Sequence, residues 1–116
     1  MADIDKAALG RRVLEHLGVL AAGETPATAD KTLVEETIDA AYDELRKPGL
    51  VPFALTAIPP WAQLGIRDWV AAAIGKTYGK PWSDVDVESM KRIAERHLAT
   101  QAAGYRHNVP IRAEYS

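Results

Sequence analysis

The side chains that could carry out acid–base, metal or nucleophilic chemistry are few and lie far apart in the chain. The three histidines are His16, His97 and His107, and no two of them have the i, i+4 spacing that places a pair of metal ligands on one helix face. The sequence contains no cysteine, which excludes a thiolate nucleophile, a disulfide and a cysteine-ligated metal. We therefore expect no catalytic site, no metal and no cofactor, and a protein that is not an enzyme.

Two short segments are similar to known functional sites but lack residues that those sites require. Glu24 lies between Gly23 and Thr25 in a loop, but glycoside hydrolysis requires a second carboxylate across a cleft, and the sequence marks none. Capping of the following helix is the better interpretation of Glu24. The segment 75–77 (Gly-Lys-Thr) is similar to the end of a phosphate-binding loop, yet it lacks the upstream glycine and falls where a helix should end.

Length and composition indicate one folded domain. The chain has 116 residues, of which 47% are hydrophobic and 26% charged, close to the average for globular proteins. No apolar run approaches the roughly 18 residues that span a bilayer, and the N-terminus lacks a basic start followed by an apolar stretch. We expect a protein that neither spans a membrane nor carries a visible secretion signal, and that assembles in the cytoplasm.

The net charge argues against a protein that binds nucleic acid through its phosphates. The formal net charge is -2, so a basic face that neutralises phosphates is not expected. Residues 1–58 carry 10 acidic and 6 basic side chains, whereas residues 59–116 carry 6 acidic and 8 basic ones. The two halves therefore have balances of -4 and +2, which would suit an assembly that pairs unlike ends; two solvated helix faces would give the same counts.

Hydrophobic periodicity predicts an all-α fold, a small four-helix bundle with an extended C-terminal arm. The expected helices start at Asp3 or Asp5, at Thr25–Pro26, at Pro59–Pro60 and at Ser83. They end within residues 17–23, at Lys47, near Tyr78 and at Gly104. The resulting domain comprises residues 1–104. Its predicted core side chains are Leu17, Val34, Ile38, Leu45, Leu64, Trp69, Val70, Ile93 and Leu98.

Two segments outside the helices are unusually apolar. Residues 50–60 contain three prolines and are expected to be an extended connector, lying either on the helices of its own subunit or on a neighbour. Residues 105–116 alternate apolar and polar side chains around Pro110, which indicates an extended arm. Phe53 in the connector and Trp82 in the turn before the last helix are possible partner surfaces. The small residues Gly65 and Gly75 permit close approach by another helix, within the subunit or between subunits.

Two stretches carry a resemblance to a known family. They are residues 17–26 (LGVLAAGETP), which join the first two helices, and residues 58–79 (IPPWAQLGIRDWVAAAIGKTYG), which form the third. Both resemble the head-to-tail adaptor, or head completion, proteins of tailed bacteriophages, and the order of elements agrees over residues 8–103. The chain departs from the family in its connector, which is longer in many relatives and here spans only residues 48–58.

The resemblance implies a structural virion protein in the neck of the particle. Such a protein forms a homo-oligomeric ring, usually of twelve copies, beneath the portal protein. The ring extends the DNA channel, helps to retain packaged DNA and docks the tail or a stopper protein. DNA passes through without specific binding. The arm would then contact the portal or a neighbouring subunit through Tyr105, Arg106, Val109, Ile111, Arg112 and Tyr115.

A different class remains open, namely a small helical regulatory or binding module, such as an accessory subunit of a transcription or toxin–antitoxin complex. A DNA-recognition helix would need arginine or lysine near its N-terminus. The fourth helix begins instead with Asp84, Asp86 and Glu88, which makes DNA reading a poor fit.

Overall fold

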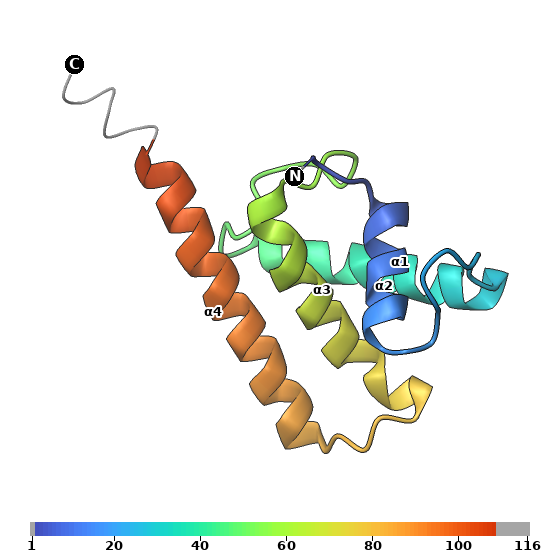
Figure 1. Cartoon of the computed structure of the whole chain (residues 1–116). Coiled ribbons are helices and arrows are strands. Elements are labelled where there is room, and N and C mark those ends of the chain that lie inside the picture. The colour runs from blue at the N-terminus through green and yellow to red at the C-terminus, as the bar shows by residue number, and fades with distance from the viewer. Residues whose placement is uncertain (1, 109–116) are drawn as a thin grey trace.

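The computed structural model describes residues 2–108, which form four α-helices and no strand (Figure 1). The helices are α1 (Lys6–His16), α2 (Thr28–Arg46), α3 (Pro60–Ile74) and α4 (Asp84–Asn108), with a 3-10 turn, η1 (Gly75–Tyr78), between the last two. The predicted all-α, four-helix fold is confirmed. α3 lies at the centre: α1 and α2 pack against it and against each other, whereas α4 packs along it from the other side.

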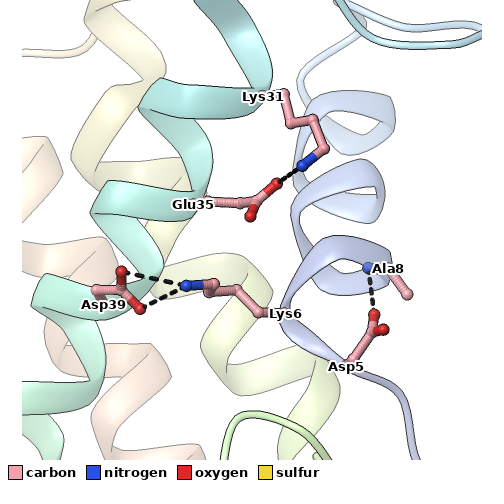
Figure 2. Close-up of polar contacts among 6 residues, drawn as sticks. All are labelled: Asp5, Lys6, Ala8, Lys31, Glu35 and Asp39. Carbon is pink, nitrogen blue, oxygen red and sulfur yellow. Dashed lines mark hydrogen bonds and ion pairs between the residues drawn. The ribbon is translucent and has the colours of Figure 1, made fainter. Parts of the chain in front are cut away.

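The helix starts follow local capping chemistry, with one exception. Asp5 caps α1 by accepting a hydrogen bond from the Ala8 amide at 2.9 Å (Figure 2). Pro60 occupies the first position of α3, as predicted. Ser83 and Asp86 form a reciprocal capping box at α4, in which each side chain accepts from the other residue's amide, at 3.1 and 3.0 Å.

The predicted start of α2 at Thr25–Pro26 is wrong, and so is the capping of α2 by Glu24. The Glu24 carboxylate accepts a hydrogen bond from the Ala21 amide at 2.7 Å, while the Glu24 amide donates to the Ala21 carbonyl at 3.1 Å. Glu24 thus closes the preceding turn, and α2 begins only at Thr28, after Ala27 and without a side-chain cap.

The predicted helix end at Gly104 is also wrong. α4 continues through Gly104 to Asn108, so residues 105–108 are helical and not the start of an extended arm. A glycine ends a helix when it adopts a left-handed conformation, as Gly79 does with φ 82°. Gly104 has no such positive φ and follows two alanines, which favour the helix. Residues 109–116 lie outside the described part of the chain.

Most of the predicted core is confirmed. Seven of the nine predicted side chains are buried, namely Leu17, Val34, Ile38, Leu45, Trp69, Val70 and Leu98. The other two are wrong, because Leu64 is 49% exposed and Ile93 is 61% exposed. Leu64 occupies an uncovered strip of α3, and Ile93 lies on α4, which has α3 as its main neighbour and so buries only a narrow strip.

The connector lies on its own subunit. Val51 and Ile58 are buried, and the Ile58 backbone exchanges two hydrogen bonds with Ile4, at 3.0 and 2.7 Å. This bridge ties the N-terminal segment to the start of α3 and gives the apolar connector a place in the core.

Candidate interaction surface

The contact between α3 and α4 is close and narrow. Gly65 on α3 faces Leu98 on α4, and a Cβ atom at Gly65 would come within 2.6 Å of the Leu98 side chain. Beside this contact, the Trp69 indole N–H donates to Glu95 Oε2 at 3.0 Å, and Lys91 Nζ lies 4.6 Å from the Trp69 ring centroid. Gly65 therefore serves packing within the subunit, and the polar partners of Trp69 fix the rotation of α4 about its axis.

A groove of about 250 Å³ runs along the other side of this contact. Its apolar lining comes from both helices and from the turn that joins them, and its charged lining comes from α1 and α3. The lining residues are His16, Arg67, Asp68, Ala71, Ala72, Trp82, Met90, Ile93 and Ala94. Ile93 is thus not an isolated apolar side chain but part of a continuous, partly open apolar surface.

The charged rim of the groove has no arrangement suited to catalysis. Arg67 donates to Asp68 Oδ1 at 2.8 Å, so this carboxylate is held by its neighbour on the same helix. His16 Nε2 lies 3.8 Å from the same oxygen, which is beyond hydrogen-bond distance. Among the side chains that the structure describes, no group of three histidine or carboxylate side chains is placed to hold a metal ion. The groove is suited to accept an apolar side chain or helix.

The two aromatic residues proposed as partner surfaces are both half-buried. Trp82 covers Gly75, where a Cβ would come within 2.1 Å of the indole ring, and its remaining surface lines the groove. Gly75 is therefore small for the sake of this intrasubunit contact. Phe53 packs edge-on against Trp61 with ring centroids 5.6 Å apart, and its carbonyl accepts a hydrogen bond from the Tyr42 hydroxyl.

Phe53 and Trp61 also line a smaller cavity of about 180 Å³, together with Asp3, Pro52, Ala57 and Pro59. The single carboxylate there has no second acid facing it among these lining residues. Apart from Asp3, the cavity is lined by apolar residues.

The residues predicted to form the contact arm lie at or beyond the end of the described part of the chain. Tyr105 and Arg106 fall in the last turns of α4, and only their helical backbone is described. Val109, Ile111, Arg112 and Tyr115 lie outside the described residues. The role assigned to them from the sequence stays a prediction.

Two titrating groups are shifted by contacts at the end of α3. Burial, together with a 2.8 Å hydrogen bond to Asp30, raises the pKa of Tyr78 to about 12. A hydrogen bond from Lys76 lowers the pKa of Asp84, which is otherwise fully exposed. Both shifts come from pairs that join η1 to a neighbouring helix, and neither group lines the groove.

One polar cluster was not found from the sequence. Gln63 is only 2% exposed and donates from Nε2 to the carbonyls of Ala2 and Ile58, both at 3.0 Å. Arg12 on α1 donates to Gln63 Oε1 at 2.7 Å. The sequence did contain one signal for this cluster, namely a glutamine, Gln63, within the otherwise apolar run of α3. The cluster holds the N-terminal segment and the connector against α3 and is structural.

Comparison of the chain with protein-family models, with curated proteins and with solved structures finds no match in any of the three. No helix within residues 2–108 is long and apolar enough to cross a lipid bilayer. What the chain does is therefore inferred from its residues and their geometry. The feature that stands out is α4 with its open groove.

Proposed function

We propose that the chain is a structural subunit, a head-to-tail adaptor of a tailed bacteriophage that assembles into a ring beneath the portal. The observation that carries the proposal is the position of α4. This helix has 25 residues, packs mainly on α3 and leaves Val85 77% exposed and Ile93 61% exposed. A long helix with one intrasubunit neighbour and an apolar groove beside it is suited to pack against another protein.

The resemblance of residues 17–26 and 58–79 to the adaptor family supports the same proposal. In the structure the first stretch leads from α1 into α2, and the second forms α3, on which the other helices pack, together with η1. The order of helices agrees with the order that the resemblance implies.

The charge of the chain agrees with a channel that DNA traverses. With a net charge of -2 for each copy, a ring of twelve would carry a large negative charge and would repel the DNA backbone. We propose that the ring extends the DNA channel, helps to retain packaged DNA and docks the tail or a stopper protein in the virion neck. DNA would pass without specific binding.

Native mass spectrometry tests the proposal directly. The chain is measured alone and after incubation with portal-bearing capsids from a candidate phage, and we expect a closed oligomer in at least one of the two. A chain that stays monomeric in solution and never attaches to any portal would contradict the adaptor function. A tight, sequence-dependent complex with duplex DNA at physiological salt would favour the regulatory module instead.

A truncated chain tests the proposed arm. A variant that ends at Asn108 retains all four helices, so its helical content and thermal stability should match those of the full chain. If residues 109–116 contact the portal, the variant should lose attachment to capsids, whereas attachment at full strength would show that the arm is dispensable.

A further inference from the structure

α2 carries a row of carboxylates on the face opposite its buried residues. The helix has six acidic and two basic side chains, and it buries Val34, Ile38, Ala41 and Leu45. Three of the acids have partners within the subunit. Asp30 accepts a hydrogen bond from Tyr78. Lys31 pairs with Glu35, and Lys6 reaches across from α1 to Asp39 (Figure 2). The exposed acids Glu36, Asp43 and Glu44 have no partner among the described residues. With the exposed Ala40, we call them the acidic stripe.

Two arginines lie on the outer face of α4, beginning one helical turn after the exposed Glu88. Arg92 and Arg96 are exposed, are one helical turn apart and form no ion pair among the side chains that the structure describes. Ile93 lies beside them and projects from the surface. These three residues form the basic stripe. Lys91 and Glu95, by contrast, are turned toward Trp69 and belong to the contact with α3.

The two stripes carry opposite charges at similar spacings along their helices. A rise of 1.5 Å per residue separates Arg92 from Arg96 by about 6 Å along the axis, and Glu36 from Asp43 by about 10 Å. Arginine side chains are long enough to bridge this difference and form paired hydrogen bonds with carboxylates. The small Ala40 lies between the carboxylates of the acidic stripe, and the large Ile93 lies beside the arginines of the basic stripe.

We propose that the acidic stripe of one subunit packs against the basic stripe of the next. The occupant of each stripe is therefore a second copy of this chain. The inference rests on the proposed ring and specifies which faces of the subunit meet in it. Because each stripe repels its own kind, a symmetric dimer through either one is disfavoured. A head-to-tail contact of two different faces is the arrangement that closes into rings.

Charge reversal tests the contact. One variant carries Arg92→Glu and Arg96→Glu, and a second carries Glu36→Lys and Asp43→Lys. Each places like charges opposite one another at the substituted positions of every subunit contact, so each alone should associate roughly 100-fold or more weakly than the wild type. An equimolar mixture restores opposite charges at both kinds of contact. It should form rings in which the two variants alternate, with an even number of copies.

A single chain with all four substitutions provides the matched control. It has the net charge of the wild type and opposite charges on its two stripes, so it should assemble by itself. Circular dichroism confirms that each variant is folded. Native mass spectrometry, with the chains free or recovered from portal-bearing capsids, counts the copies and their composition.

The outcomes separate this inference from the proposed function. If the wild type forms rings and each reversed variant alone forms them equally well, the proposed contact between the stripes is wrong, while the adaptor function is not affected. Variants that fail alone and are not rescued by mixing or by the fourfold exchange would show that the stripes face a different partner, such as the portal or DNA, which also overturns the inference. A wild-type chain that forms no ring, free or on capsids, would overturn both.

Discussion

The body formed by α1, α2 and α3 differs from α4 in how many neighbours each helix has. In the body every helix packs against the two others, and their contacts surround fully buried side chains such as Leu9, Ile38 and Val70. α4 packs mainly on α3, and among its residues up to 104 it buries only Ala94, Leu98 and Ala102, one residue per turn. With 25 residues it is also longer than α3, which has 15, and its C-terminal end projects beyond the body (Figure 1).

This difference separates two tasks within one small chain. The body supplies the burial that makes the subunit stable, since apolar surface enclosed on several sides contributes most to folding. α4 is held by a narrow seam and keeps most of its circumference open, so it is the element on which a partner can pack without any change in the core.

The largest expected effect tests this division with two isoleucines. Ile38→Ala removes a side chain that is 0% exposed in the body and should destabilise the fold by about 2–5 kcal/mol. Ile93→Ala on α4 should cost below about 0.5 kcal/mol, because that side chain is 61% exposed. Urea denaturation of both variants gives the two free energies. Similar losses at the two positions would show that α4 belongs to the core in the same way as α2.

The sequence predicted the body better than it predicted α4. A stripe of period 3.6 identifies the face of a helix that is apolar, and in α2 that face has two neighbours, so Val34, Ile38 and Leu45 are buried as predicted. The same reading of α4 placed Ile93 inside. Periodicity does not reveal how many neighbours a helix has, and a single neighbour covers only part of an apolar arc.

The capping signals also differed in how well the sequence alone could predict them. Ser83 and Asp86 act on adjacent backbone groups, so their capping box could be predicted from four residues alone. From its place in the sequence, the Glu24 carboxylate could accept a hydrogen bond from an amide of its own turn or from an amide at the start of α2. The sequence does not decide between the two, and in the structure the carboxylate accepts from the Ala21 amide. The candidate site was harder still. The groove combines residues from α1, α3, the following turn and α4, and only the fold brings them together.

The second prediction concerns the seam that holds α4. Gly65→Ala places a methyl group within 2.6 Å of Leu98, which is 0% exposed and has no space to move into. We expect α4 to be displaced from α3, with a loss of about 1–3 kcal/mol. Thermal unfolding measures the loss, and quenching of Trp69 fluorescence by acrylamide reports the opening of the seam. An unchanged stability would mean that α4 slides along α3 without cost.

The third prediction uses the other glycine of this pair of helices. Gly104 lies within α4, and a Cβ there would meet nothing within 4 Å. Gly104→Ala should therefore stabilise α4 by about 0.5–1 kcal/mol and raise the helical content slightly. Circular dichroism and thermal unfolding test both effects. Destabilisation would indicate a left-handed residue at Gly104, and hence that the helix ends there.

The smallest effect appears only at alkaline pH and concerns a link inside the body. The Tyr78 hydroxyl donates to Asp30 and so joins η1 to α2. Because the folded-state pKa of Tyr78 is raised to about 12, above the ordinary tyrosine value of 10.0, the folded chain retains this proton to a higher pH than the unfolded chain does. The stability that this proton provides is complete below pH 10 and is lost as the pH rises through about 12.

Tyr78→Phe removes the titrating group and should flatten the fall in melting temperature between pH 10 and about 12. The difference in ultraviolet absorbance between wild type and variant isolates this one phenol and should give a midpoint near 12. The matched change on the α4 side is Lys76→Ala, which removes the ion pair with Asp84. It should leave the fall in melting temperature at alkaline pH unchanged, since both partners of this ion pair are exposed and screened by salt. A phenol that titrates near 10 would mean that η1 is not held against α2, and that the body ends at α3.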